Sequence, residues 1–445
     1  MRFRPVRMTL VVVLVLVAAG CDWTMFGDGP AHTNYDATEK TIGVGNVASL
    51  TTAWTGATGG FVQSSAAVVD GVAYVGSYDG KLYAFDAAGS TGCSGTPKTC
   101  APLWTTMSLG VGVYASPAVV NGVVYIGSSE KLYAFDAAGS TGCSGVPKTC
   151  SPLWTSVGTG TVIDSSPAVA GGVVYFGSGP RLYAFDAGGS TGCSGAPKTC
   201  APLWTAAVPN LGYSSPAVAR GVVYIASRSS GPETYDAKLY AFDAAGSTGC
   251  SGTPKTCAPL WTAGIETSDS PPAVANGVVY VGAVDRDESL FAFDAAGSTG
   301  CSGIPKTCEP LWTAGTQSGV YSSPAVANGI VYVGSSDRRL YAFDATGTTA
   351  CSGSPKTCAP LWWGTTGGIL ESSPAVANGV VYIGSIDGRL YAFDAVGSIS
   401  CSGAPKTCQP LWKGTTGGDI EASPAVANGV VYVGSNDDKL YAFKP

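Results

Sequence analysis

The stretch SSPAVANGIVYVGSSDRRLYAFDATGTTACSGSPKTCAPLWW, residues 322–363, is one unit of a repeat that fills most of the chain. Three of its segments, SSPAVA, IVYVGS and LYAFD, consist mainly of small, β-branched and aromatic residues, and a fourth, PLWW, follows a loop with two cysteines. Asn328-Gly329, between the first two segments, is typical of a tight β-hairpin turn. Gly, Asn, Asp and Pro punctuate the other junctions, so we expect four short strands in each unit.

The unit returns at a nearly constant period. Leu-Tyr-Ala-Phe, or once Leu-Phe-Ala-Phe, begins at Leu82, Leu132, Leu182, Leu239, Leu290, Leu340, Leu390 and Leu440. A matching tryptophan recurs at Trp54, Trp104, Trp154, Trp204, Trp261, Trp312, Trp362 and Trp412. The tryptophan spacings are 50, 50, 50, 57, 51, 50 and 50 residues, and the longest one contains the insertion RSSGPETYDAK, residues 228–238. Four-stranded units at this period predict an all-β, eight-bladed β-propeller of antiparallel blades.

The order of the segments also predicts how the ring closes. Trp54 comes before the first Leu-Tyr-Ala-Phe, and only Lys444 and Pro445 follow the last one, so the eighth blade lacks a fourth strand of its own. We expect the N-terminal segment around Trp54 to complete the last blade beside residues 440–444, which leaves no open sheet edge. This divides the chain into a lead-in at residues 22–50 and a single propeller at residues 51–445.

The composition fits such a fold and excludes one class of partner. The 445 residues include 62 Gly and 28 Pro, with 45% apolar and only 12% charged residues. This is enough apolar material for a large core, with many turns and few long surface helices. The formal net charge of −6 provides no basic footprint, so we expect no nucleic-acid partner.

The N-terminus is typical of an exported protein. Residues 1–7 carry three arginines, and residues 8–20 are apolar but too short to span a membrane, as in a signal peptide. Residues 17–21, Val-Ala-Ala-Gly-Cys, resemble the lipobox of bacterial lipoproteins. That resemblance implies lipidation of Cys21 and a mature protein that is held at a membrane of the cell envelope, facing the periplasm or the exterior. The alternative is plain secretion with an unpaired thiol at Cys21.

The other cysteines form seven Cys-x6-Cys loops. This spacing differs from the short Cys-x2-Cys of zinc sites, and the chain has a single histidine, His32. Disulfides persist outside the cytosol, so we favour seven local disulfides over metal sites. The predicted pairs are Cys93–Cys100, Cys143–Cys150, Cys193–Cys200, Cys250–Cys257, Cys301–Cys308, Cys351–Cys358 and Cys401–Cys408. On the chain-entropy model, each ring contributes about 2–3 kcal/mol.

Each cysteine loop also carries a Pro-Lys pair. The lysines are Lys98, Lys148, Lys198, Lys255, Lys306, Lys356 and Lys406. Since the loops join third to fourth strands, we expect the lysines to form a ring on one face. They either build an anion-binding rim or stay solvated, partly neutralised by Asp86, Asp136, Asp186, Asp243, Asp294, Asp344 and Asp394. Exposed lysines usually stay in water, which favours the second interpretation.

Taken together, these features resemble the pyrroloquinoline-quinone (PQQ)-type eight-bladed propeller. The lead-in DWTMFGDGPAHTNY, residues 22–35, is similar to the entry segment of that superfamily, and Ala84, Asp86, Thr91-Gly92 and Trp104 match its tryptophan-docking repeat. The inserted cysteine loop is a departure from this pattern. The superfamily includes quinoprotein dehydrogenases and non-catalytic lipoproteins, among them the propeller of the outer-membrane assembly machinery.

Variation among the units is concentrated in the loops opposite the cysteine loops, where propellers commonly bind partners. The residue just before each first strand forms one variable column. It comprises Gln63, Tyr114, Asp164, Tyr213, Asp269, Tyr321, Glu371 and Glu421. We expect a ring at the channel mouth. Its carboxyl groups either bind Ca²⁺ or a polar ligand, or they line a wide, wet channel with unlinked side chains, and we favour the second interpretation. Among the tryptophans, Trp363 is the better ligand candidate, and we expect the acidic Asp285, Asp287 and Glu288 to be solvated.

Two functions remain open. We favour an exported, membrane-anchored, non-catalytic binding or scaffold propeller without a cofactor, which binds a protein or a small polar ligand on the variable face. The alternative is a PQQ-dependent alcohol or sugar dehydrogenase, with PQQ and Ca²⁺ as cofactors. Many such enzymes carry an adjacent Cys-Cys pair and long insertions, and this chain has neither. No Walker lysine follows the glycine pairs, and His32 alone makes a Ser-His-Asp site improbable.

Overall fold

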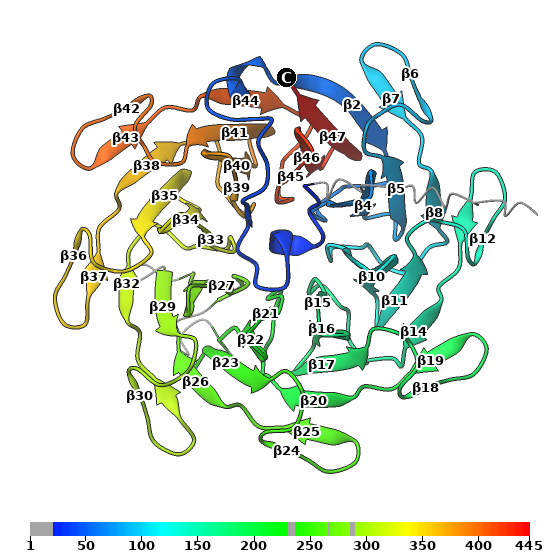
Figure 1. The fold of residues 1–445 in the computed structure, drawn as a ribbon, viewed down its shortest axis with the longest axis horizontal. Coiled ribbons are helices and arrows are strands. Elements are labelled where there is room, and N and C mark those ends of the chain that lie inside the picture. The colour runs from blue at the N-terminus through cyan, green and yellow to red at the C-terminus, as the bar shows by residue number, and fades with distance from the viewer. Residues whose placement is uncertain (1–20, 230, 232–235, 266–267, 285–289) are drawn as a thin grey trace, which may run out of the picture.

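The computed structural model describes residues 21–229, 231, 236–265, 268–284 and 290–445. The expected signal peptide and the acidic Asp285, Asp287 and Glu288 lie outside these residues. The described chain forms eight β-sheets arranged as the blades of a closed ring (Figure 1), which confirms the predicted fold class. Two short 3-10 helices, η1 (Phe26–Asp28) and η2 (Val47–Ser49), lie in the lead-in. No described helix is long and apolar enough to cross a membrane.

Each blade has four antiparallel strands from the axis outward. The inner strands are β3 (Ala67–Val69), β9 (Ala118–Val120), β15 (Ala168–Ala170), β21 (Ala217–Ala219), β27 (Ala273–Ala275), β33 (Ala325–Ala327), β39 (Ala375–Ala377) and β45 (Ala425–Ala427). The second strands are β4 (Val72–Gly76), β10 (Val123–Ser128), β16 (Val173–Ser178), β22 (Val222–Ala226), β28 (Val278–Gly282), β34 (Ile330–Ser335), β40 (Val380–Ser385) and β46 (Val430–Ser435).

The two outer positions carry the large aromatic residues. The third strands are β5 (Leu82–Asp86), β11 (Lys131–Asp136), β17 (Arg181–Asp186), β23 (Lys238–Asp243), β29 (Leu290–Asp294), β35 (Arg339–Asp344), β41 (Arg389–Asp394) and β47 (Lys439–Lys444). The outer strands are β8 (Trp104–Thr106), β14 (Trp154–Ser156), β20 (Trp204–Ala207), β26 (Trp261–Gly264), β32 (Trp312–Ala314), β38 (Trp362–Thr365), β44 (Trp412–Thr415) and β2 (Thr51–Ala57). The inner strands are shorter than expected, because the residues before them, such as Ser322, Ser323 and Pro324, lie outside the ladders.

The turn between the first two strands has the predicted hairpin geometry. Asn328 and Gly329 have φ angles of 50° and 80°. Positive φ at both central positions matches the twist of the flanking strands and favours Asn-Gly. Because successive strands of a blade run antiparallel, the turns between first and second strands all lie on one face of the ring. The turns between second and third strands lie on the other face.

The ring closes as predicted from the segment order. β2 pairs antiparallel with β47, and Thr55 lies opposite Tyr441. Both ends of the propeller therefore belong to one blade, and no unpaired edge separates the first unit from the last.

The cysteine loops contain the predicted disulfides and also form strand pairs that were not predicted. All seven expected disulfides are present. Each loop is also a small hairpin whose second strand pairs in parallel with the outer strand of the preceding blade. The hairpins are β6–β7 (Cys93–Ser94, Lys98–Cys100), β12–β13 (Cys143–Ser144, Thr149–Cys150), β18–β19 (Cys193–Ser194, Lys198–Cys200), β24–β25 (Cys250–Ser251, Lys255–Cys257), β30–β31 (Cys301–Ser302, Thr307–Cys308), β36–β37 (Cys351–Ser352, Thr357–Cys358) and β42–β43 (Cys401–Ser402, Lys406–Cys408).

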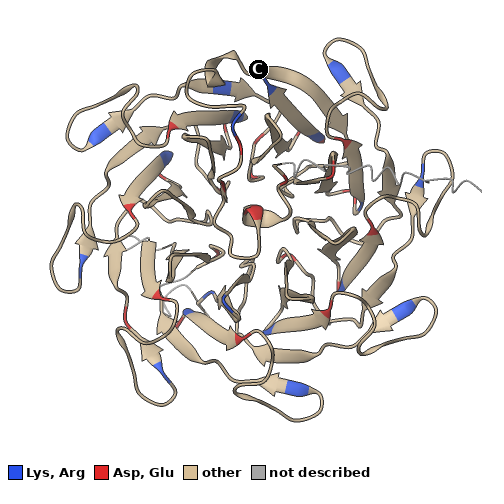
Figure 2. Cartoon of the chain, in the orientation of Figure 1, with Lys and Arg blue, Asp and Glu red and all other residues tan. Residues whose placement is uncertain are grey.

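These hairpins correct the expectation for the lysines. They lie around the circumference of the ring, and so do their lysines (Figures 1 and 2). Lys98 Nζ donates to the carbonyl of Gly89 at 2.9 Å, and the six other loop lysines do the same in their own units. In the described part of the chain, no ion pair joins these lysines to Asp86 or its copies. The aspartates instead accept hydrogen bonds within their own turns, as Asp86 does from Ser90 and Thr91.

The tryptophans pack blades together, as expected. A Cβ on Gly89 would lie 2.1 Å from Cδ1 of Trp54, so this glycine lets the ring approach closely. The indole N–H of Trp54 also donates to the carbonyl of Ala87 at 3.1 Å. Trp363 is a poor ligand candidate: it lies on outer strand β38, packs against Tyr341 and lies under the Arg339 guanidinium.

Candidate ligand-binding cavity

The lead-in forms the floor of the central channel. Residues 21–50 cross the middle of the ring (Figure 1). Carbonyls of the lead-in accept hydrogen bonds from the central valine N–H of several inner strands; Thr24 accepts from Val119 and Ala31 from Val274, both at 2.8 Å. Its strand β1 (Tyr35–Asp36) pairs with β39, next to the axis. Phe26 forms part of the floor of the space above.

His32, the single histidine, is a structural part of this floor. It is completely buried and its ring makes an edge-to-face contact with Phe26 at 5.1 Å between centroids. Burial lowers the pKa of His32 to about 4, so the imidazole is neutral at pH 7. It takes no part in the cavity wall.

Above the floor lies one cavity of about 530 Å³. All eight residues of the variable column lie on its wall, although they come from eight different blades. They are Gln63, Tyr114, Asp164, Tyr213, Asp269, Tyr321, Glu371 and Glu421. Each precedes an inner strand, so the column ends up around the axis on the face opposite the Asn-Gly turns.

A ring of serines forms the next layer of the wall. The backbone N–H of Ser65 donates to Oγ of Ser116 at 2.9 Å, and the same bond repeats from blade to blade. The remaining bonds run from Ser116 to Ser166, Ser166 to Ser215, Ser323 to Ser373, Ser373 to Ser423 and Ser423 to Ser65. These bonds fix the spacing of the inner strands, and hence the diameter of the cavity.

The serine ring is interrupted at the fifth blade. Pro271 stands where the other units have serine, and it provides neither a hydroxyl acceptor nor an N–H donor. As a result, the buried Oγ of Ser323 has no hydrogen-bond partner among the described residues. The cavity is therefore asymmetric on this side.

The same side carries the one cation that the described residues place on the cavity wall. Arg228 Nε lies 3.1 Å from Oδ1 of Asp269. Burial raises the pKa of Asp269, and Arg228 opposes this shift. Arg228 begins the insertion of the fourth unit. The inserted length was visible in the sequence, but the position of the arginine in the cavity was not predicted.

The remaining carboxyl groups make the cavity acidic. Burial raises the pKa of Asp164, and burial followed by the charge of Glu421 raises the pKa of Glu371. Glu421 accepts a hydrogen bond of 2.8 Å from Asn436. One guanidinium thus faces four carboxyl groups on the described wall. Incoming cationic groups would relieve this imbalance.

Tyrosines supply aromatic surface between the carboxyl groups. Tyr114 packs edge-to-face against Tyr78 with 5.5 Å between ring centroids, and burial raises the pKa of Tyr114 to about 12. Tyr213 is 56% exposed and lies on the same wall. Aromatic faces and carboxylates together favour ligands that are polar and positively charged.

Comparisons with known proteins support the fold and leave the role open. The family model described as "Outer membrane protein assembly factor BamB" matches residues 253–352 and 355–445. No curated protein matches the chain. Among solved structures, BamB from Moraxella catarrhalis is 16% identical with a TM-score of 0.61, and the match covers 89% of this chain and 98% of that one.

Two dehydrogenase structures are similar in fold. Quinohemoprotein alcohol dehydrogenase from Comamonas testosteroni is 17% identical with a TM-score of 0.64, and the match covers 95% of this chain and 80% of that one. A europium-containing methanol dehydrogenase is 14% identical with a TM-score of 0.63, covering 95% of this chain and 98% of that one. The chain therefore has an eight-bladed β-propeller fold, and its residues 253–352 and 355–445 match the BamB family model.

Proposed function

We propose that this protein is an exported, lipid-anchored, non-catalytic propeller that binds a partner in its central cavity. The observation that carries this proposal is the convergence of all eight variable-column residues on one cavity wall. A frame repeated with little change presents eight positions that are occupied by four different residue types, Gln, Tyr, Asp and Glu, which is typical of a recognition surface. Seven disulfides fit a compartment outside the cytosol.

The position of Cys21 supports a membrane anchor that leaves the cavity open. Its backbone N–H donates to Oδ1 of Asn428 at 3.0 Å, in the turn between β45 and β46. This turn lies on the face opposite the variable column. A lipid on Cys21 would hold the Asn-Gly face toward the membrane, with the cavity facing away from it.

The chemistry of the cavity indicates the kind of partner. Three carboxyl groups without a cationic partner on the described wall, with tyrosines between them, favour lysine or arginine side chains or a small polar cation. The solved structure named BamB and the matching family model concern outer-membrane protein assembly. By this likeness we infer a protein partner, which would insert a cationic group into the cavity.

A quinoprotein dehydrogenase is the second candidate, favoured by the carboxyl column and by the likeness to the two dehydrogenase folds. PQQ is a planar quinone tricarboxylate, and its site must supply positive charge. On the described wall only Arg228 is cationic, and it is already paired with Asp269. The residues present therefore do not fit PQQ, and we derive no catalytic step from it.

Cofactor binding separates the two candidates. PQQ and CaCl₂ are added to protein comprising residues 22–445, which is then passed through a gel-filtration column and assayed for dye reduction with an alcohol. We expect no quinone absorbance in the protein fraction and no dye reduction. Retained quinone together with alcohol-dependent dye reduction would show an enzyme and contradict the proposal.

A further inference from the structure

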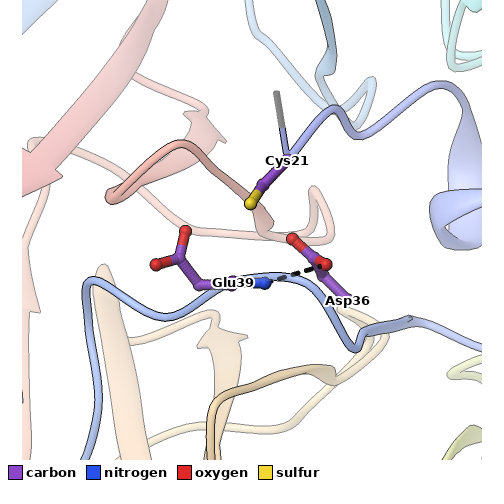
Figure 3. Close-up of side chains that lie close together, drawn as sticks. All are labelled: Cys21, Asp36 and Glu39. Carbon is purple, nitrogen blue, oxygen red and sulfur yellow. Dashed lines mark hydrogen bonds between the residues drawn. The ribbon is translucent and has the colours of Figure 1, made fainter. Parts of the chain in front are cut away.

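Three segments that are distant in sequence meet on the Asn-Gly face. They are Cys21 at the start of the lead-in, the turn from Asp36 to Glu39, and the β45–β46 turn at Asn428-Gly429. The Cys21 sulfur and one carboxylate oxygen from each of Asp36 and Glu39 lie within 4.8 Å of one another. Figure 3 shows the three side chains converging on one space.

Both carboxylates are buried, and one oxygen has no partner. Asp36 is 3% exposed and Glu39 is 1% exposed. Glu39 accepts hydrogen bonds from the backbone of Ile42 at 3.2 Å and of Gly429 at 2.8 Å. Asp36 Oδ1 accepts from the N–H and the hydroxyl of Thr38, both at 2.6 Å. Asp36 Oδ2 is buried without a hydrogen-bond partner among the described residues, beside Cys21 and Glu39 (Figure 3).

No described cation balances these charges. None of the ion pairs in the described structure includes Asp36 or Glu39, and nearby Lys40 donates to the carbonyl of Ala37 instead. Asp28 adds little charge at pH 7, because burial, followed by the charges of Asp36 and Asp22, raises its pKa to about 8. Buried carboxylates are costly unless they are paired or bind a metal.

We propose that Asp36 and Glu39 bind a divalent cation at the junction between the lead-in and the propeller. Carboxylate oxygens are ligands for hard ions, so the ion expected in an exported protein is Ca²⁺, with water completing its coordination. A lipidated Cys21 would carry a thioether, which is a soft group and would not serve as a ligand for Ca²⁺. The ion would tie the lead-in to the last blade next to the anchor point. This site is separate from the central cavity and does not depend on a ligand there.

The experiment uses the mature chain, residues 21–445, with Cys21→Ser to remove both lipid and thiol. Calorimetric titration with CaCl₂ is expected to give one equivalent, with Kd in the range of about 10⁻⁴–10⁻³ M that is typical of extracellular sites. Asp36→Asn keeps the acceptor for Thr38 but removes the charge, and it should weaken binding at least about tenfold. Glu39→Gln should have the same effect, and either variant suffices if the other one does not fold.

The matched control is E371Q/E421Q, which removes two carboxylates from the cavity and leaves the junction unchanged. Ca²⁺ binding that survives in this control and is lost in D36N or E39Q supports the proposal. Binding that is lost in the control and retained in D36N places the ion in the cavity and overturns it. Absence of Ca²⁺ binding to the Cys21→Ser chain also overturns it.

Discussion

The backbone N–H of Ser423 donates a 2.9 Å hydrogen bond to Oγ of Ser65, joining the eighth blade to the first across 358 positions of sequence. This bond is the closing link of the serine ring that surrounds the cavity. Together with the pairing of β2 and β47, it closes the propeller near the axis as well as at its periphery. The shape of the cavity is therefore set by the frame, and its chemistry by the variable column.

Restoring serine at the interrupted position should stabilise the protein. In Pro271→Ser, the new hydroxyl can accept from Ser215 N–H, and the new N–H can donate to the unpartnered Oγ of Ser323. Each hydrogen bond is worth about 1 kcal/mol, while losing proline gives back about 0.4–1 kcal/mol through the unfolded chain. We expect a net gain of about 1 kcal/mol in the free energy of unfolding, measured by urea denaturation.

Two alanine variants test the same serine ring by removing hydroxyl groups from it. Ser323→Ala removes a hydroxyl that has no partner, so its free energy of unfolding should stay near that of the wild type. Ser373→Ala removes the acceptor of the Ser323 N–H and should cost about 1–3 kcal/mol. Equal losses in the two variants would contradict the hydrogen-bond assignment.

Two of the disulfide hairpins should differ in the outer strand that they stabilise. Strand β7 pairs with β2, the strand that closes the ring, whereas β25 pairs with β20 inside the continuous chain. Removing Cys93–Cys100 or Cys250–Cys257 by double Cys→Ala substitution should cost about 2–3 kcal/mol each. Hydrogen exchange of residues 51–57 should accelerate in the first variant only. Equal exchange in both variants would show that β7 does not support closure.

The turn aspartates should make stability depend on pH. Burial alone would raise the pKa of Asp86, but hydrogen bonds from Ser90 and Thr91 outweigh it and lower the pKa to about 2. Because the folded-state pKa lies below the usual value of about 3.9, this stabilisation is complete above pH 4 and is lost as pH falls toward 2. The difference in unfolding free energy between wild type and Asp86→Asn should shrink over that window. A constant difference from pH 7 to pH 2 would contradict this role of the carboxylate.

Membrane fractionation and the mass of the N-terminal peptide test the lipid anchor. In the native host, the wild-type chain should fractionate with membranes, and its N-terminal peptide should carry the mass of an acylated Cys21. Cys21→Ser should move the protein to the soluble fraction without changing its melting temperature. An unmodified wild-type Cys21 would leave plain secretion as the explanation of the signal peptide.

Much of the fold could be predicted because the eight copies of the repeat can be compared with one another. The recurrence of Leu-Tyr-Ala-Phe gave the number of blades, and the position of Trp54 ahead of the first copy gave the closure. Gln63 and Glu421 could be assigned to one column for the same reason, since equivalent positions in a closed ring surround one axis. The function of that column does not follow from its position.

Features that depend on contacts between units could not be predicted in this way. Each cysteine loop is local in sequence, so nothing in it reveals that Lys98 belongs to a strand beside Trp54 of the preceding blade. The lead-in has no second copy to compare, and the position of Phe26 in the cavity floor emerged only in the structure. Arg228 lies in a unique insertion, and its contact with Asp269 crosses between units.

Site-specific photocrosslinking in the native host tests the central claim most directly. A photoreactive residue replaces Tyr213 on the cavity wall, or Val146 at the fully exposed tip of a cysteine hairpin on the circumference. We predict a discrete protein adduct from position 213 that weakens in the E371Q/E421Q background, and none from position 146. An adduct from position 146 alone, or no adduct from position 213, would contradict binding at the cavity.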